Sequence, residues 1–224
     1  RIVKNARKLD VIAYEEMLEL SSLGAKVLHT RSVELAMRYG VRLQVLSSFE
    51  EKNGTLVCRE DKMLESKIIS GISCSKEEAK ITLTGVDDKP GVAAAIFGPL
   101  SESGINVDMI IQNISENNST DLTFSCPSSQ VLEAEEAIKM ASKKKEISFK
   151  THIIDTNVAK VSLVGIGMRS HTGIAKKMFE ALANENINIL VISTSEIKIS
   201  ILVEQKYMEL AVQTLHDAFE LEKT

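Results

Sequence analysis

The amino-acid sequence predicts an α+β protein in which two copies of one β-α-β-β-α unit follow a shorter α/β segment. Two stretches of the chain match each other: ITLTGV at residues 81–86 resembles VSLVGI at residues 161–166. Apolar residues alternate in both stretches, as they do in a half-buried strand. The residues after both stretches carry apolar side chains at helical spacing. An internal duplication explains all three observations, because the matching positions are those that a fold constrains.

The first 60 residues do not belong to this repeat. Apolar residues at helical spacing predict a helix over residues 14–23, and a second helix follows at residues 29–39. Residues 43–47 predict a buried strand, and the polar stretch 49–67, which contains Asn-Gly, predicts a hairpin or a connector. This order is typical of the last α/β unit of a larger parallel-sheet domain.

Each copy of the repeat begins with a strand that ends in a glycine turn, at Gly85 and at Gly165. A helix with one apolar stripe follows in both copies. The stripe consists of Val92, Ile96, Phe97 and Leu100 in the first copy and of Ile174, Met178, Phe179 and Leu182 in the second. Gly104 or Asn186 then closes the helix in a polar turn. Pro99 lies late in the first helix, where we expect it to kink or shorten that helix.

The rest of each copy predicts two strands and a second helix. The predicted elements are strands 107–111 and 119–126 with helix 131–142 in the first copy, and strands 189–193 and 196–203 with helix 207–221 in the second. A strand at residues 148–154 closes the first copy. The order β-α-β-β-α-β gives an antiparallel sheet with both helices on one face, the ferredoxin-like arrangement. Two such sheets predict side-by-side packing of the copies, within one chain or between subunits.

Charge and composition argue against several classes of function. The 224 residues carry a net charge of −4 without long charged blocks, so a nucleic-acid or membrane-surface role has no electrostatic support. A ferredoxin-like RNA-binding domain needs a basic face and aromatic residues for base stacking. This chain has no Trp, three Tyr and six Phe, which disfavours that alternative. No apolar run approaches the roughly 20 residues of a membrane-spanning helix.

The three cysteines are odd in number and widely spaced, and the four histidines do not cluster near them. This usage predicts reduced, buried thiols in a cytoplasmic protein and gives no sign of a zinc site. The basic run at residues 143–145 is expected to be the solvated end of a helix. Because the sequence starts without Met and without an apolar signal region, we expect it to begin inside a longer protein.

Several motifs in the chain resemble one family. Residues 5–24, NARKLDVIAYEEMLELSSLG, are similar to the end of the kinase domain of bacterial aspartate kinases. Four further motifs resemble the two regulatory ACT domains of these enzymes: LTGVDDKPGVAAAIF, INVDMIIQN, VGIGMRSHTGIA and STSEIKISILVE. ACT domains have the β-α-β-β-α-β fold predicted above, and the resemblance covers essentially the whole chain.

The resemblance implies a domain organisation. Residues 1–60 would be the end of an amino-acid kinase domain with a linker, and residues 79–154 the first ACT domain. The second ACT domain would consist of residues 61–78 together with residues 155–224. The first ACT unit is then inserted into the second, which makes residues 68–74 a strand of the second unit.

The resemblance also implies a function. Enzymes of this family use ATP to phosphorylate the side-chain carboxylate of L-aspartate, on the route to lysine, threonine and methionine. Their ACT domains are expected to bind lysine, threonine or both, to inhibit the kinase, and to form homodimers or higher oligomers. Regulatory chains similar to this one also act as partners of full kinase chains. The alternative is a stand-alone ACT sensor of another enzyme, against which the kinase-like residues 1–60 argue.

An amino-acid effector carries a carboxylate and an ammonium group, and the turn between strand and helix suits the carboxylate. Free backbone N–H groups and the helix dipole favour an anion at that place. In the first copy, Gly91 lets the backbone approach a ligand closely, while Asp88 accepts from an ammonium or a hydroxyl group. The alternative is that Asp88 is only the N-cap of the helix, with Pro90 in the first turn.

Further contacts follow from the resemblance to effector sites of the family. The effector-binding residues implied for this chain are Asp88, Lys89, Pro90, Gly91, Val92, Ala93, Asn106, Val107, Asp108, Gln112, Ile174, Ala175, Asn188, Ile189 and Ser195. The apolar members would act through backbone groups and packing. Asn106 is also typical of a turn, and Ser195 of a strand-end hydroxyl bonded to the backbone.

The two copies differ where the ligand would bind. HTG at residues 171–173 replaces KPG at residues 89–91, and the second copy has no acid at the position of Asp88. We therefore do not expect both copies to bind the same ligand in the same way. One copy would hold the effector, while the other supplies the opposing wall across a dimer interface.

Little of the kinase chemistry is expected in this chain. Arg1 and Lys26 match nucleotide-contacting positions of the family, where a cation beside a phosphate makes physical sense. The chain shows no Ser-His-Asp, HExxH or Walker-type motif. The resemblance places the phosphate loop and the aspartate-binding residues upstream. We therefore expect no catalytic residue, metal site or cofactor in this chain, no kinase activity from it alone, and ATP with Mg²⁺ in the full enzyme.

Overall fold

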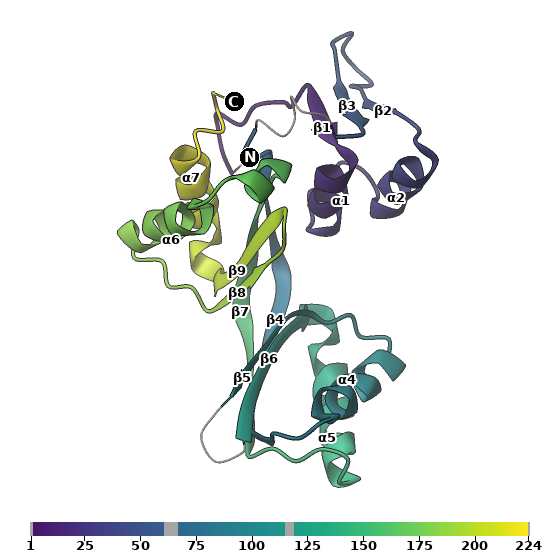
Figure 1. Ribbon diagram of the computed structural model, residues 1–224, viewed down its shortest axis with the longest axis vertical. Coiled ribbons are helices and arrows are strands. Elements are labelled where there is room, and N and C mark those ends of the chain that lie inside the picture. The colour runs from purple at the N-terminus through teal and green to yellow at the C-terminus, as the bar shows by residue number, and fades with distance from the viewer. Residues whose placement is uncertain (1, 61–66, 115–118, 224) are drawn as a thin grey trace. The chain divides into compact units, whose positions relative to one another are not determined.

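Figure 1 shows the computed structural model, which describes residues 2–60, 67–114 and 119–223. The chain forms two compact units. The first unit consists of Arg1–Ser75 and Lys160–Thr224, and the second of Lys76–Ala159. Among the described residues, no helix has both the length and the apolar character needed to cross a membrane. The domain boundaries expected from the sequence remain a prediction.

The N-terminal part of the first unit is a small three-stranded sheet with two helices. β1 (Val11–Ala13) runs parallel to β3 (Thr55–Cys58), and β2 (Leu43–Val45) pairs with β3 in the antiparallel sense. The helices α1 (Tyr14–Ser22) and α2 (Thr30–Tyr39) confirm both sequence predictions for this segment.

Two other expectations for this segment need correction. β1 was not foreseen, because its three residues, VIA, are too few to show a period. β2 is not buried as predicted: Leu43 and Val45 are half-buried and Gln44 is exposed, since β2 lies at the edge of the sheet. For residues 49–67 we expected a hairpin or a connector, and the described part is a connector that leads into β3; the hairpin that β3 forms is with β2, which precedes this stretch. Residues 61–66 lie outside the described residues.

The helices of this segment end where local chemistry stops them. The His29 ring caps α2 by accepting a hydrogen bond of 3.2 Å from the Arg31 N–H. Gly40, at φ 65°, ends α2 in the left-handed conformation that favours glycine. Ile12, Met17, Val33 and Val57 form a buried core that also contains Val164, so the N-terminal segment and the second copy of the repeat share one core.

The second copy of the repeat completes the first unit. It contains the end of β7 (Thr151–Val164), a 3₁₀ turn (Ile166–Ser170), α6 (Ile174–Asn184), β8 (Val191–Thr194), β9 (Lys198–Glu204) and α7 (Met208–Ala218). β8 and β9 form an antiparallel hairpin. Met178 and Leu182 of the predicted apolar stripe are completely buried in α6, as the helical spacing requires.

The second unit contains the first copy of the repeat. Its elements are β4 (Gly71–Asp87), α4 (Val92–Glu102), β5 (Asp108–Ile114), β6 (Ser119–Pro127), α5 (Val131–Lys143) and the start of β7. β6 pairs with β4 and with β5 in the antiparallel sense. Ile81, Leu83, Ile96 and Leu100 lie in its core, and Phe97 meets the core residue Phe124 edge to face with ring centres 5.5 Å apart.

The duplication expected from the sequence is confirmed by the order of elements in the two copies. Both repeat helices have 11 residues, and both begin after a left-handed glycine, Gly91 at φ 91° and Gly173 at φ 86°. The expectation that Pro99 shortens its helix is therefore wrong. Pro99 lies in the last turn of α4, where its carbonyl still accepts from the Ser103 N–H at 3.1 Å.

Strand continuity is a second correction. We expected separate strands at residues 68–74 and 81–86, but β4 is one strand from Gly71 to Asp87. Likewise, the strands expected at residues 148–154 and after Val161 form the single strand β7. The residues that join them, SKEEAK and DTNVAK, contain neither Gly nor Pro, so nothing local breaks the extended backbone.

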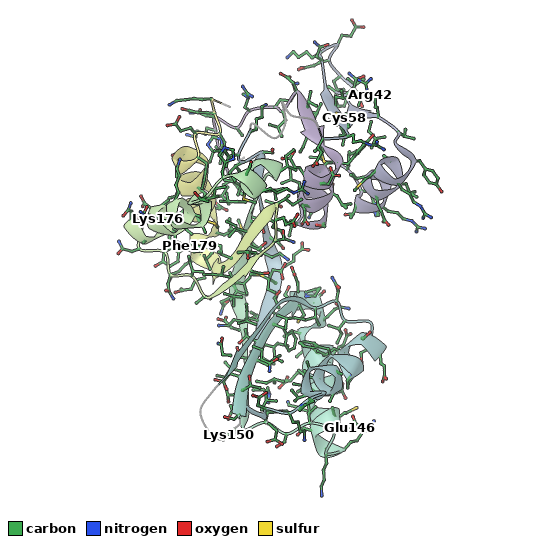
Figure 2. The ribbon with its side chains drawn as sticks, in the orientation of Figure 1. Arg42, Cys58, Glu146, Lys150, Lys176 and Phe179 are labelled. Carbon is green, nitrogen blue, oxygen red and sulfur yellow. The ribbon has the colours of Figure 1, made fainter. Side chains whose placement is uncertain are left out.

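The three cysteines differ in burial, which gives a prediction about their reactivity. Cys126 is buried in the second unit, and desolvation, reinforced by the Glu78 charge, raises the pKa of its thiol to about 11. Cys58 (Figure 2) and Cys74 are only half-buried, so the expectation that the thiols are buried is wrong for these two. Because the thiolate is the nucleophile, we expect Ellman's reagent at pH 8 to label Cys126 on the order of 100-fold more slowly than the other two thiols. Equal rates for all three thiols in the native protein would contradict this expectation, and a denatured sample supplies the control.

Candidate functional site

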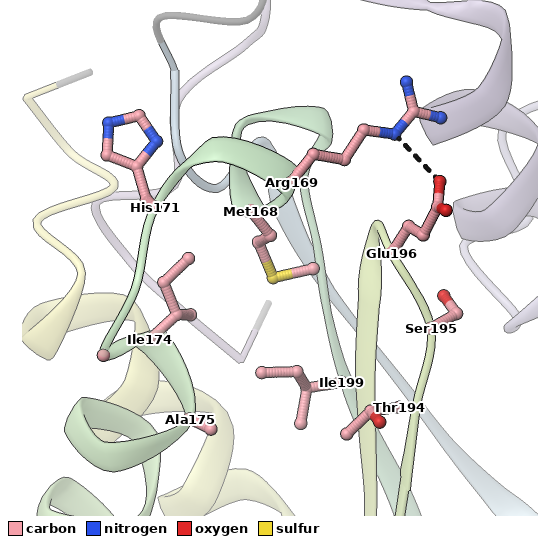
Figure 3. A pocket seen from close by; sticks show the side chains of 10 residues that line it. Met168, Arg169, His171, Ile174, Ala175, Thr194, Ser195, Glu196 and Ile199 are labelled. Atoms are coloured by element: carbon pink, nitrogen blue, oxygen red, sulfur yellow. Dashed lines mark ion pairs between the residues drawn. The ribbon is translucent and has the colours of Figure 1, made fainter.

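A cavity of about 530 Å³ lies beside the start of α6 in the first unit (Figure 3). Three segments surround it: the turn after β7, the first residues of α6 and the tip of the β8–β9 hairpin. Its lining residues are Met168, Arg169, His171, Gly173, Ile174, Ala175, Thr194, Ser195, Glu196 and Ile199. The cavity thus brings together three residues that were predicted to contact an effector: Ile174, Ala175 and Ser195. Two other predicted contacts, Asn188 and Ile189, are not among the lining residues.

The backbone at the start of α6 offers hydrogen-bond donors to this cavity. Gly173 is the N-cap, and as a glycine it has no side chain with which to satisfy the first N–H groups of the helix. Its left-handed φ of 86° turns the chain sharply from the preceding loop into α6. Ile174 and Ala175 follow in the first turn, so a carboxylate in the cavity would meet free N–H groups and the positive end of the helix dipole.

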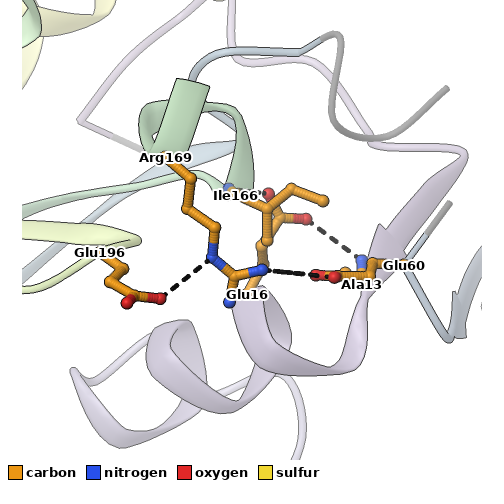
Figure 4. Close-up of polar contacts among 6 residues, drawn as sticks. All are labelled: Ala13, Glu16, Glu60, Ile166, Arg169 and Glu196. Atoms are coloured by element: carbon orange, nitrogen blue, oxygen red, sulfur yellow. Dashed lines mark hydrogen bonds and ion pairs between the residues drawn. The ribbon is translucent and has the colours of Figure 1, made fainter. Parts of the chain in front are cut away.

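Charged side chains of both signs stand at the edge of the cavity. Arg169 Nε lies 3.4 Å from Glu196 Oε2, and Arg169 Nη1 lies 3.0 Å from Glu60 Oε2 (Figure 4). Two carboxylates from different segments thus hold one guanidinium group in place. Glu196, whose side chain is 83% exposed, can turn toward a ligand that enters from solvent.

Apolar side chains form the rest of the lining, with Met168, Ile174 and Ile199 facing the hollow in Figure 3. His171 Nδ1 lies 2.7 Å from the Gly167 carbonyl oxygen, and since that oxygen can only accept, the ring proton is on Nδ1. The cavity therefore combines an anion-binding helix start, a charged edge and an apolar wall. This combination suits a small zwitterion with an aliphatic side chain.

Sequence reasoning did not foresee Met168, Arg169, His171 or Glu196 at this site. Met168 and Arg169 fall in the stretch where the second copy is two residues longer than the first, so the alignment of the repeats gave them no counterpart. Glu196 follows Ser195 directly, but a carboxylate in a hairpin tip is ordinary in sequence. Their spatial proximity is the signal that was missing.

The corresponding turn in the first copy lies on the surface of the second unit. Asp88, Lys89, Pro90 and Gly91 are exposed, while Val92 is buried and Ala93 is half-buried at the start of α4. The N-cap of α4 is Gly91, so the alternative that Asp88 caps this helix is wrong. Asp88 therefore remains a candidate for contact with a ligand.

The second-strand residues of the first copy also lie near or on the surface. Asn106 is exposed and Val107 half-buried, and Asp108 begins β5. Asp108 Oδ1 accepts from the Met109 N–H at 2.8 Å, in a backbone where Met109 has φ 48°. Gln112 is exposed on β5 opposite Leu122 of β6. Their role as effector contacts remains a prediction.

The expected remnants of a nucleotide site are sparse. Arg1 lies outside the described residues, and Lys26 is exposed in the turn after α1 at φ 55°. Within the described ranges, His, Cys, Asp and Glu form no group of three or more that could hold a metal ion. The role of Lys26 as a nucleotide contact remains a prediction.

Comparison with known proteins places these features in context. Family models described as the ACT domain match residues 80–139 and residues 161–219. The aspartokinase of Pseudomonas aeruginosa is 53% identical over 224 aligned residues, which cover 99% of this chain and 54% of that protein. The chain thus spans about half the length of the curated relatives it matches.

Solved structures agree with this similarity. The ligand-free regulatory subunit of aspartate kinase from Thermus thermophilus is 37% identical, with a TM-score of 0.63, and the match covers 68% of this chain and 99% of that one. E. coli aspartokinase III in complex with lysine and aspartate is 26% identical, with a TM-score of 0.76. That match covers 98% of this chain and 48% of the E. coli chain.

Proposed function

The chain belongs to the aspartokinase family, and from this premise we propose that it is the feedback-regulated C-terminal region of an aspartate kinase. In this proposal it binds lysine, threonine or both, and thereby controls the ATP-dependent phosphorylation of L-aspartate. The observation that carries the proposal is the cavity at the start of α6, where backbone N–H groups, a charged edge and an apolar wall meet. Lysine is supported further by its presence in the E. coli aspartokinase III complex.

The N-terminal segment supports the kinase part of the proposal. Four large apolar side chains of this segment are mostly exposed to solvent: Val27 (57%), Tyr39 (70%), Leu46 (57%) and Phe49 (96%). Large apolar side chains gathered on one segment are costly to expose to water, so they commonly mark a covered surface. We propose that the rest of a kinase domain covers them. ATP and Mg²⁺ would bind in that domain, and the present chain alone would form no aspartyl phosphate.

The effector fits the cavity by its charged ends. Its carboxylate would accept hydrogen bonds from the first N–H groups of α6, and its ammonium group would pair with Glu196. Met168, Ile174 and Ile199 would contact the aliphatic part of the ligand. In the first copy, Asp88 is the acid that would meet an ammonium or hydroxyl group.

Contacts inside the first unit offer a path from the cavity to the kinase-like segment. Arg169 binds Glu60, and Lys198 Nζ lies 3.0 Å from Glu19 Oε2 on α1. An effector that prefers one arrangement of these contacts would shift the kinase by its differential binding energy, typically about 1–3 kcal/mol. We further propose that the chain acts in the cytoplasm as a homodimer or higher oligomer, alone or with full kinase chains.

Titration calorimetry with L-lysine, L-threonine and both together tests the effector proposal. We expect binding of at least one amino acid, and about threefold to tenfold weaker binding in Glu196→Gln, because the partner of the ammonium group loses its charge. Asp88→Asn reports separately on the turn of the first copy.

The control variant for this experiment is Lys206→Gln, which removes an exposed charge paired with Glu204 outside the cavity. This substitution should leave the affinity unchanged. Absence of binding for lysine, threonine and their mixture would contradict the proposal, as would equal affinities of the wild type, Glu196→Gln and Asp88→Asn.

A further inference from the structure

A second cavity, of about 260 Å³, lies elsewhere in the first unit. The N-terminal segment, the end of α1, the start of β4 and α7 surround it. Its lining residues are Val3, Ala6, Arg7, Leu9, Leu20, Ala25, Lys67, Ile69, Ser70, Gly71, Ile72, Val212, His216 and Leu221. None of these residues lines the cavity at α6, and none was a candidate site residue in the sequence analysis.

Hydrogen bonds fix the wall that the N-terminal segment contributes. Gln213 Nε2 on α7 donates to the Ile2 carbonyl oxygen at 2.9 Å. Asn5 Nδ2 donates to Glu222 Oε2 at 3.3 Å. These bonds hold residues 2–7 against α7 and the residues that follow it, so the cavity is enclosed by tethered segments of the chain.

A buried imidazole in the lining has an unsatisfied nitrogen. His216 is only 6% exposed, and its Nδ1 has no hydrogen-bond partner among the described residues. Asp217 Oδ1 lies 3.5 Å from this nitrogen but forms no hydrogen bond with it. The side chain of Asp217 is 83% exposed. A buried polar group without a partner is unfavourable, and a ligand in the cavity could supply the missing interaction at the imidazole.

The charges in the lining select the sign of that ligand. Arg7 and Lys67 are the charged side chains of the lining, and no Asp or Glu is among the lining residues. A zwitterionic amino acid would therefore place its ammonium group beside cations without a carboxylate to pair with. An anion without an ammonium group meets two cations in the lining, Arg7 and Lys67, while the nearby carboxylates of Asp217 and Glu222 lie outside the lining.

The remaining lining selects the body of the ligand. Val3, Leu9, Leu20, Ile69 and Val212 are branched aliphatic residues. No aromatic ring is present among the lining residues. A short, branched aliphatic chain matches this wall, and the volume accommodates such a molecule with room for solvent.

We propose that this cavity is a binding site for a small branched aliphatic monocarboxylate, such as a 2-oxo acid, with the carboxylate toward Arg7 and Lys67 and a polar oxygen at His216. The ligand would bridge the N-terminal segment and α7. This inference does not depend on the identity of the effector at α6.

Thermal shift and titration calorimetry on the 224-residue chain with 4-methyl-2-oxopentanoate test the proposal. We expect binding and a raised Tm, because a ligand that binds only the native state stabilises it. 3-Methylbutan-1-amine, with a similar branched chain and the opposite charge, should not bind. L-Leucine, with the same carbon chain and an ammonium group in place of the 2-oxo group, should bind at least about tenfold more weakly.

Substitutions at exposed residues locate the site without disturbing the core. Arg7→Gln should weaken binding at least about fivefold, and Ala6→Phe should abolish it by filling the cavity. Arg42→Gln, which removes an exposed arginine of the same unit that does not line the cavity, should leave the affinity unchanged.

His216→Gln then tests the imidazole, with weaker binding expected. The proposal is overturned if the oxo acid neither binds nor shifts the Tm at a concentration of about 10 mM, which would detect even millimolar affinity. It is equally overturned if the amine binds as well as the oxo acid, or if Arg7→Gln and Ala6→Phe bind like the wild type. Both of these variants change exposed side chains, so they test the proposal even if His216→Gln does not fold.

Discussion

Replacing Glu16 by alanine is expected to destabilise the protein by about 3 kcal/mol, because this side chain is the acceptor for three segments at once. Its carboxylate accepts from the Ala13 N–H at 3.2 Å, from Ser70 Oγ at 2.5 Å and from the Ile166 N–H at 2.9 Å. Glu16 is only 1% exposed, so water cannot replace the lost acceptor. Two buried backbone N–H groups would be left without a partner.

Urea unfolding of Glu16→Ala, Glu16→Gln and the wild type measures this effect. Glu16→Gln keeps one acceptor oxygen and should lose about half as much stability as Glu16→Ala. Glu34→Ala, an exposed glutamate on α2, is the matched control and should change the free energy of unfolding by less than about 0.5 kcal/mol. A Glu16→Ala variant as stable as the control would show that these hydrogen bonds do not hold the three segments together.

Glu16 also supports a turn that lines the α6 cavity, so its replacement should affect ligand binding as well as stability. Ile166 begins the turn that leads to Met168 and Arg169 in the α6 cavity, and Figure 4 shows Glu16 below Arg169. Loss of the Ile166 hydrogen bond should therefore loosen one wall of that cavity. If the proposed effector binds there, Glu16→Gln should weaken its binding while Glu34→Ala does not.

Replacing Gly165 by alanine is expected to lower stability by about 3 kcal/mol or more, which corresponds to a loss of about 6–12 °C in Tm for a chain of this length. A β-carbon at this position would lie 2.2 Å from the Ile68 carbonyl oxygen and 2.8 Å from Ile69 Cα. Both atoms belong to the backbone, so no side chain can move aside. The Gly165 N–H also donates to the Ile197 carbonyl oxygen at 3.0 Å, which opposes a shift of the turn.

Gly173→Ala is the comparison for this substitution. Gly173 has φ 86°, but a β-carbon there meets nothing within 4 Å. The cost should be limited to the backbone conformation, about 1 kcal/mol. Differential scanning fluorimetry should thus rank the wild type above Gly173→Ala and Gly173→Ala above Gly165→Ala, and a reversed order of the two variants would show that the close approach to Ile68 is relieved elsewhere.

The matching glycines of the two copies are needed for different reasons. Gly165 is extended at φ 179°, and it is required because the backbone of Ile68 approaches it. Gly85 has φ 62°, a left-handed conformation, and its neighbour is the flexible Lys150 side chain. The alignment of the repeat identified both glycines, yet it could not tell a steric requirement from a conformational one, because that difference lies in residues far away along the chain.

The amino-acid sequence by itself determined the duplication and most of the helices and strands, but not β1 or the continuity of β4 and β7. The apolar periods of α4 and α6, the glycine turns that precede these helices and the alternation in β4 and β7 are local patterns, and each is set by neighbours within about four residues. Ile174, Ala175 and Ser195 became candidate site residues through the resemblance to effector sites of the family.

Tertiary structure alone decided which side chains meet. Glu16 contacts Ile166 across 150 residues, and Arg169 joins Glu60 across 109. His216 lines one cavity with residues of the N-terminal segment for the same kind of reason. Such contacts depend on how whole elements pack, and packing is a property of shape and volume that no short pattern encodes. The amino-acid sequence displays what is local: hydrogen bonds between near neighbours and the spacing of apolar residues within a helix or strand. Contacts between distant segments exist only once the core has formed.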